Sequence, residues 1–209
     1  MELDNIYQNV IDGEASAVES GVKAALANGV SAGTILQNGL IKAMGEVGQR
    51  YEDGDLYVPE MLVAAQAMQR GMALLKPYLI ESGAKSVGTV VIGAVKGDLH
   101  DIGKNLVGVM LEGAGFEVID LGTDVSADKF VDAVKKHNAT VVGLSALLTT
   151  TMQSMITTIE TFKKVSIRQD VKVVIGGAPV TSEFAKQIGA DGYAPDAPSA
   201  VRLVRELLG

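Results

Sequence analysis

The chain contains no cysteine and no tryptophan, only two histidines, and few aromatic side chains, which make up 4% of its 209 residues. The absence of cysteine excludes disulfides, thiolate metal sites, iron–sulfur clusters and cysteine nucleophiles, so any metal must be bound by nitrogen or oxygen. Lysine and arginine never cluster beyond a pair such as Lys135-Lys136, and the formal net charge is −7. No nucleic-acid-binding surface and no membrane-binding surface is therefore expected.

Long apolar runs are also missing, since none approaches the roughly 18 residues that a membrane-spanning helix requires. The N-terminal segment Met1-Glu2-Leu3-Asp4 is acidic and lacks the basic, then apolar, order of a signal peptide. These absences predict a cytoplasmic protein. Hydrophobic residues make up 47% of the chain, which is enough for a substantial core.

Residues 1–84 carry apolar side chains at helical spacing. The clearest stripe steps by four and three residues, from Met61 through Ala65, Met68, Met72 and Leu75 to Leu79. A second stripe runs over residues 36–51, and two shorter ones over 3–10 and 18–26, with polar or glycine-containing breaks between them. This pattern predicts a four-helix bundle as a first domain.

Residues 85–209 change to β-rich apolar runs that alternate with helical segments, which predicts a parallel sheet with crossover helices. The predicted strands are 87–95, 117–121, 140–145, 172–176 and 191–194. The predicted helices are 101–114, 126–137, 150–165, 180–188 and 197–208. Five such β-α units fit a Rossmann-like or flavodoxin-like domain, whose ligands bind at the carboxyl ends of the strands.

One loop carries most of the functional information. It reads Lys96-Gly97-Asp98-Leu99-His100-Asp101-Ile102-Gly103-Lys104-Asn105 and follows the first predicted strand. An imidazole with an aspartate two residues before it is equipped to be a metal ligand with its own carboxylate partner. The loops after the third and fourth strands are expected at the same edge. They contain hydroxyl groups at Ser145 and Thr149 and bare backbone at Gly176-Gly177, which would admit a planar or phosphate-bearing group.

Each of these features also has a plain structural interpretation. A single histidine near a helix start often only makes a hydrogen bond, and Gly-Gly after a strand is commonly a turn. The Ser/Thr run would cap the next helix at Thr149 or Thr150. His137 lies at a predicted helix C-terminus, where it suits the helix dipole. The order of the features along the chain, more than any one of them, favours a binding site.

Three motifs occur in that order. Asp98 to Gly103 matches DxHxxG, Ser145-Ala146-Leu147 matches SxL 45 residues after His100, and Gly176-Gly177 begins 31 residues after Ser145. Together they resemble the B12-binding domain of methionine synthase, of certain mutases, and of the corrinoid proteins of methyltransferase systems. The resemblance spans nearly all of residues 87–209, and the segment 51–62 resembles part of the helical cap of that family.

The resemblance implies a corrinoid cofactor, cobalamin or another cobamide. His100 would coordinate cobalt from the lower face and displace the cofactor's own nucleotide base. Asp98 would hydrogen-bond the second ring nitrogen, and Thr151 would complete a proton relay. The bundle would cover the reactive upper face through Tyr57, Val58 and Glu60. The other residues implied to contact the cofactor are Gly97, Leu99, Asp101, Ile102, Gly103, Ser145, Leu147, Thr149, Gly176, Gly177, Tyr193 and Ala197.

The function that this resemblance implies is methyl carriage on cobalt. A substrate-specific methyltransferase would load a methyl group from a methylamine, methanol or a methoxy-aromatic compound. A second methyltransferase would pass the group to tetrahydrofolate or a thiol, and a reductive activator would be a further partner. The chain would not be catalytic alone, because beyond the cobalt site no cluster of histidines, cysteines or carboxylates remains for an independent centre.

Three alternatives make different demands on the sequence. A B12-dependent sensor or regulator would need a basic DNA-binding module, and a light-sensing cap would need tryptophan. The small subunit of a mutase would lack residues 1–84. A flavodoxin-like domain with a coincidental motif would bind no corrinoid.

Overall fold

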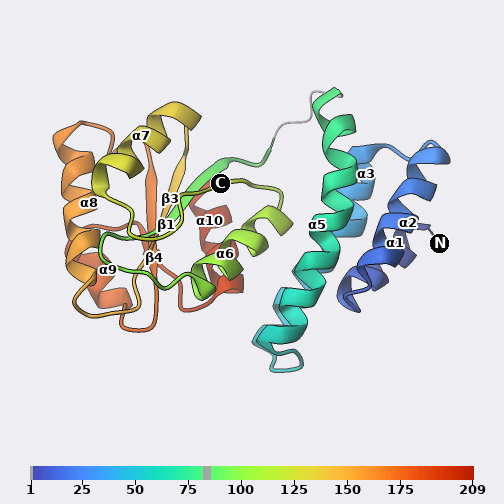
Figure 1. Ribbon diagram of the computed structural model, residues 1–209, viewed down its shortest axis with the longest axis horizontal. Coiled ribbons are helices and arrows are strands. Elements are labelled where there is room, and N and C mark those ends of the chain that lie inside the picture. The colour runs from blue at the N-terminus through green and yellow to red at the C-terminus, as the bar shows by residue number, and fades with distance from the viewer. Residues whose placement is uncertain (1, 82–85) are drawn as a thin grey trace. The chain divides into compact units, whose positions relative to one another are not determined.

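The computed structural model describes residues 2–81 and 86–209, which form two compact units (Figure 1). One unit is helical and the other contains the sheet. The predicted domain boundary between residues 84 and 85 lies outside the described residues.

The helical unit consists of four long helical segments, one of which contains a π-helical turn. Its elements are α1 (Glu2–Ile11), α2 (Ala15–Ala27), α3 (Ala32–Ile35), the π-helix η1 (Leu36–Ile41), α4 (Lys42–Glu52) and α5 (Val58–Glu81). α3, η1 and α4 follow one another without a break, and α1, α2, α4 and α5 pack together. The third segment begins at Ser31, which caps it: the Ser31 hydroxyl accepts a hydrogen bond from the amide of Thr34. The predicted four-helix bundle is confirmed.

The core of the bundle follows the predicted stripe on α5. Met61, Ala65, Met68 and Leu75 are all buried. Complete burial of a side chain of the size of leucine or methionine stabilises a protein by roughly 1.5–3 kcal/mol. The amphipathic spacing therefore accounts for the assembly of these helices.

The π-helix is the feature that the periodicity missed, because residues 36–51 read as one regular α-helix. Ile35 and Leu40 lie five residues apart and are both completely buried. An α-helix places residues five apart on different faces, whereas the wider π-turn, with its i to i+5 bonds, brings them onto one face. Gly39 allows close packing here, since a Cβ atom at this position would lie 3.0 Å from the Ile6 side chain.

The second unit is a five-stranded parallel sheet covered by helices. Its strands are β1 (Thr89–Ala94), β2 (Glu117–Asp120), β3 (Val141–Ser145), β4 (Lys172–Gly176) and β5 (Gly192–Tyr193), in the order β2-β1-β3-β4-β5. Its helices are α6 (Ile102–Gly113), α7 (Ala127–His137), α8 (Met152–Lys164), α9 (Ser182–Ile188) and α10 (Ala197–Leu208). Every strand and helix predicted for this half is present, and the strand order is the flavodoxin-like one.

Helices cover both faces of the sheet. Figure 1 shows α7, α8 and α9 on one side and α6 and α10 on the other. The core between the sheet and the first group includes Phe130, Met155 and Phe162, all completely buried. The two faces of the central strands are thus both enclosed, as parallel sheets require.

The helix ends in this unit follow standard capping chemistry. Ser126, Thr181 and Asp196 each accept a backbone amide at the start of α7, α9 and α10. Asn138 and Gly189 end α7 and α9 in the left-handed conformation. His137 is the last residue of α7, as predicted for a residue that suits the helix dipole.

The register of the sheet brings three strand ends into line. Ala94 of β1 lies opposite Ser145 of β3, which lies opposite Gly176 of β4. The loops that follow these strands therefore start at one edge of the sheet. Among residues 2–81 and 86–209, no helix is long and apolar enough to cross a membrane.

Candidate functional site

The site begins with a tight turn at the carboxyl end of β1. The amide of Asp98 donates to the carbonyl of Val95 at 2.9 Å, and Gly97 between them has a φ of +85°. A positive φ at the third position, with Lys96 at the second position outside the positive-φ region, defines a type II turn, and glycine adopts this φ without a steric penalty. The turn directs the Asp98 side chain inward, where it is completely buried.

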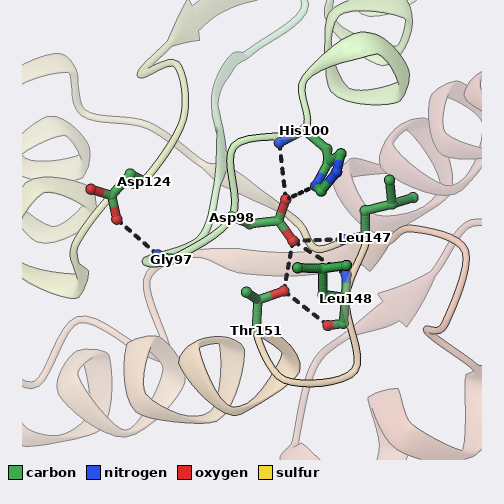
Figure 2. Close-up of polar contacts among 7 residues, drawn as sticks. All are labelled: Gly97, Asp98, His100, Asp124, Leu147, Leu148 and Thr151. Atoms are coloured by element: carbon green, nitrogen blue, oxygen red, sulfur yellow. Dashed lines mark hydrogen bonds and ion pairs between the residues drawn. The ribbon is translucent and has the colours of Figure 1, made fainter.

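Both oxygens of the Asp98 carboxylate are fully engaged (Figure 2). Oδ1 accepts the backbone amide of His100 at 3.0 Å and its ring Nδ1 at 2.8 Å. Oδ2 accepts the amide of Leu147 at 2.7 Å and the hydroxyl of Thr151 at 2.6 Å. The loop after β1 and the loop after β3 are thereby joined through one side chain.

Burial alone would raise the pKa of the Asp98 carboxyl, because it removes water from the charged form. The hydrogen bonds from Thr151, from the amides of His100 and Leu147, and from the His100 ring outweigh burial and hold this pKa well below its usual range. Asp98 is therefore a carboxylate at neutral pH. Since an ionised carboxylate only accepts hydrogen bonds, Nδ1 of His100 must carry a proton.

The His100 ring is hydrogen-bonded through one of its nitrogens and is open to solvent on the other side. Its side chain is 49% exposed, and within the described part of the chain its Nε2 atom has no partner. In the neutral ring, Nε2 therefore presents its lone pair to solvent, as a metal ligand must. Exposed apolar side chains accompany the ring in sequence: Leu99 is 72% exposed and Ile102 79% exposed. Leu147 and Leu148, which bind Asp98 through their amides, also have exposed side chains.

The glycine pair after β4 makes a close backbone approach to the loop after β3. A Cβ atom on Gly177, whose φ is +124°, would lie 1.9 Å from the carbonyl oxygen of Ala146. A Cβ atom on Gly176 would lie 3.0 Å from the carbonyl oxygen of Ala194. Packing of the loops therefore already requires small residues here, whatever ligand approaches them.

The other predicted contacts at this edge vary in accessibility. Leu147 and Thr149 are exposed, and Ser145 is half-buried at the end of β3. Gly103 lies exposed in α6, and a Cβ atom there would meet nothing within 4 Å. Exposed Asp101 precedes α6.

Two further predicted contacts lie at the edge strand β5 and just after it. Tyr193 in β5 packs partly against the core, and Ala197 at the start of α10 is buried. Tyr193 pairs with Ile175 of β4, next to the glycine pair.

The expectation that Thr149 or Thr150 caps the next helix is wrong. α8 begins at Met152 after Thr151, and no side-chain cap bond is made there. The Thr151 hydroxyl instead lies 2.6 Å from Asp98 Oδ2 and 2.9 Å from the Leu148 carbonyl. Because a hydroxyl has one proton, it donates to one of these acceptors at a time.

The three predicted cap residues lie in the helical unit, around the start of α5. Tyr57 is 69% exposed and Val58 is also exposed. The Tyr57 amide donates to the Glu60 carboxylate at 2.8 Å, so Glu60 caps the helix that it belongs to. This bond gives Glu60 a structural role in addition to the predicted one.

Asp124, which follows β2, was not predicted from the sequence. Its Oδ1 accepts the Gly97 amide at 2.8 Å (Figure 2). Its own amide donates to the Asp98 carbonyl at 2.9 Å. Its carboxylate also pairs with Lys96, and these bonds, with the Gly97 amide first, lower the pKa of Asp124. Only the loops after β1, β3 and β4 were expected at the site. The rule that parallel strands end at one edge applied to β2 as well.

An ion pair made by a buried lysine supports the start of α6. Lys104 is almost completely buried, and its ammonium group contacts the carboxylate of Asp120 at the end of β2 and the side chain of Asn105. Asp120 in turn accepts the Gly122 amide at 2.8 Å. The helix that follows the His100 loop is thus tied to the strand next to β1.

The α/β unit thus presents one imidazole, backed by a buried carboxylate, at the carboxyl edge of a flavodoxin-like sheet. Two family models described as B12 binding domains match the chain, over residues 88–202 and 2–76. The chain belongs to this B12-binding family, and the resemblance carried by the DxHxxG, SxL and Gly-Gly motifs is confirmed, together with the corrinoid cofactor that it implies.

Individual relatives agree with this assignment. A corrinoid protein of Desulfitobacterium hafniense is 40% identical over 99% of this chain and 97% of its own length. The dimethylamine corrinoid protein of Methanosarcina barkeri is 48% identical over 83% of this chain and 82% of its own. The methanol:cobalamin methyltransferase complex of Methanosarcina barkeri contains a chain with a TM-score of 0.88 and 31% identity, covering 99% of this chain and 79% of that one.

Proposed function

We propose that this chain is a corrinoid protein that carries a methyl group between two methyltransferases. The observation that carries the proposal is the half-exposed imidazole of His100, fixed from behind by the buried carboxylate of Asp98 at 2.8 Å. When bound, the corrinoid supplies a cobalt atom that takes up and gives up a methyl group. Two relatives support this role: one is named as a dimethylamine corrinoid protein, and the other is a chain of a methanol:cobalamin methyltransferase complex.

The composition of the site fits a macrocyclic cofactor better than a free metal ion. Within the described residues, no group of three or more His, Cys, Asp or Glu could hold a metal ion. A metal held by a single imidazole must therefore bring its remaining ligands with it, as the cobalt of a corrinoid does. The exposed apolar side chains of Leu99 and Ile102 suit contact with a large ring.

The residues of the chain take the following proposed roles. Nε2 of His100 would bind the cobalt, Asp98 fixes the ring's tautomer, and Thr151 stabilises the charge on Asp98. Gly103 and the loops after β3 and β4 would hold the cofactor's nucleotide tail. Tyr57, Val58 and Glu60 would cover its upper face. The remaining proposed contacts are Gly97, Leu99, Asp101, Ile102, Ser145, Leu147, Thr149, Gly176, Gly177, Tyr193 and Ala197.

The proposed partners follow from the carrier role. One methyltransferase loads the group from a methylamine, methanol or methoxy-aromatic donor, and a second one delivers it to tetrahydrofolate or a thiol. A reductive activator restores the reduced cobalt. The sensor alternative is not favoured, because the relatives are named as a dimethylamine corrinoid protein and as part of a methanol:cobalamin methyltransferase complex.

Isotopic labelling of histidine tests the ligand assignment directly. The chain is loaded with cobalamin after growth on ¹⁵N-histidine and reduced to Co(II), and the nitrogen splitting is recorded by electron paramagnetic resonance. We expect the ¹⁵N doublet of a protein histidine to replace the ¹⁴N triplet of the cofactor's own base.

Two variants assign that signal to one residue. His100→Ala should abolish the ¹⁵N doublet, whereas His137→Gln, which changes the only other histidine, should retain it. A doublet that survives in His100→Ala, or wild-type protein that takes up no corrinoid, would overturn the proposal. Loading and unloading by candidate methyltransferases, followed through the cobalamin absorbance, then identifies donor and acceptor.

A further inference from the structure

The central peptide of the turn before Asp98 is held from two sides. Its N–H group, on Gly97, donates to Asp124 Oδ1 at 2.8 Å, and its carbonyl, on Lys96, accepts the Ser154 hydroxyl at 2.9 Å. Asp124 comes from the loop after β2 and Ser154 from α8. Two elements that lie far apart in the sequence therefore fix the orientation of one peptide group, three residues before His100.

The backbone alone does not select this orientation. Type I and type II turns differ mainly in whether the central peptide is turned over, and glycine at position 97 permits either form. The Gly97 amide and the Asp98 carbonyl are both bound by Asp124, through its side chain and its backbone amide respectively. The side chain of Asp124 thus favours the form of the turn that this structure has.

The conformation of Asp124 itself is costly for most residues. Its φ is +53°, in the left-handed region, which asparagine, aspartate and glycine tolerate best. The Asp124 side chain is partly exposed, and it takes no part in the hydrogen bonds that join the side chains of Asp98, Thr151 and His100. Its bonds go to the turn and to Lys96.

We propose that Asp124 is a positioning residue for the proposed cobalt ligand: by binding the Gly97 amide, it preorganises the turn that delivers Asp98 and His100. This inference rests on the proposed function of His100. The bonds of Asp124 go to Gly97, Lys96 and the Asp98 carbonyl and not to the His100 ring, so it acts on the ring through the loop. Preorganisation of the loop before the cofactor arrives reduces the ordering cost of binding.

Three substitutions separate this role from a general structural one. Asp124→Gly removes the acceptor and keeps a residue that tolerates the positive φ. Asp124→Asn keeps a neutral acceptor and the backbone preference, so it should rescue most of the effect. Lys96→Met removes the exposed ion pair with Asp124 and leaves the bond to Gly97 intact, which makes it the matched control.

The first measurement uses the full chain loaded with cobalamin and labelled with ¹⁵N-histidine. In Asp124→Gly, the ratio of Co(II) without the ¹⁵N doublet to Co(II) with it should rise roughly tenfold, which corresponds to one hydrogen bond to a charged group. Asp124→Asn and Lys96→Met should stay close to wild type. Wild-type behaviour of Asp124→Gly overturns the positioning role, whereas wild-type protein without a doublet overturns the ligand assignment instead.

A second measurement on cofactor-free protein does not depend on the corrinoid. Amide hydrogen exchange of Gly97 and the ¹⁵N shifts of the His100 ring should both change in Asp124→Gly, while amide protection in β1 stays unchanged. An unchanged Gly97 amide and ring contradict the proposal even if coordination is altered. If the glycine variant fails to fold, Asp124→Ser, whose hydroxyl stands one bond closer to the backbone, replaces it.

Discussion

Thr151→Val removes one hydroxyl from the site and keeps the shape of the side chain. That hydroxyl is buried and donates to the Asp98 carboxylate at 2.6 Å. A hydrogen bond to a charged group contributes about 1.5–3 kcal/mol, so we expect the variant to lose about 2 kcal/mol of unfolding free energy at pH 7. In the α/β unit this corresponds to a roughly 30-fold faster exchange of the β1 amides.

The loss should depend on pH with a defined sign. The Thr151 hydroxyl stabilises Asp98 only while the carboxyl is ionised, and this hydrogen bond helps to hold its pKa below the usual range. The stability that the low pKa provides is complete above the unfolded-state value of about 3.9, and is lost as pH falls from there towards the folded-state value. The difference between variant and wild type should therefore be largest at neutral pH and should narrow below about pH 4.

Hydrogen exchange followed by mass spectrometry on the peptide that contains β1 measures this effect within one unit of the chain. Thr161→Val is the matched control, because it makes the same change on the same helix, where the hydroxyl bonds only the Thr157 carbonyl. The control should remain within about 0.5 kcal/mol of wild type. Equal exchange rates in Thr151→Val and Thr161→Val at pH 7 would refute the stabilisation of Asp98 by Thr151.

Three further predictions concern the remaining parts of the site. Gly177→Ala should destabilise the α/β unit by at least about 3 kcal/mol, seen in denaturant unfolding, because its Cβ atom would lie 1.9 Å from the Ala146 carbonyl at a strained φ. Gly103→Ala, in open space, should instead stabilise cofactor-free protein by roughly 0.5–1 kcal/mol and weaken cobalamin binding in a titration; unweakened binding would contradict the proposed path of the nucleotide tail. Asp98→Asn should lower the share of histidine-coordinated Co(II), and an unchanged spectrum would show that the charge is dispensable.

Much of the fold could be predicted because it rests on local periodicity. The strands and helices of residues 86–209 alternate clearly, and the stripe from Met61 to Leu75 identifies the face of α5 that is buried. The π-helix Leu36–Ile41 could not be predicted in this way. Its wide turn results from the packing of Ile35 and Leu40 into one core, and spacing by four residues alone gives no sign of that tertiary demand.

The candidate site, too, could be predicted only in part from the sequence. Asp98 and His100 could be predicted because they stand two residues apart in one loop, and the structure joins them at 2.8 Å. Asp124 lies 27 residues from its partner Gly97, and only the register of β1 and β2 brings the two loops together. The helix cap expected at Thr149 or Thr150 was wrong because a buried carboxylate competes for the neighbouring hydroxyl of Thr151.

The contact of Gly177 with the Ala146 carbonyl has a consequence for protein engineering. The main chains of the loops after β3 and β4 pack directly against each other there, without an intervening side chain, so neither loop can move towards the other. If these loops hold the nucleotide tail as proposed, a redesign for another cobamide would need to exchange both loops together. Grafting either one alone would bring a mismatched main chain against its neighbour.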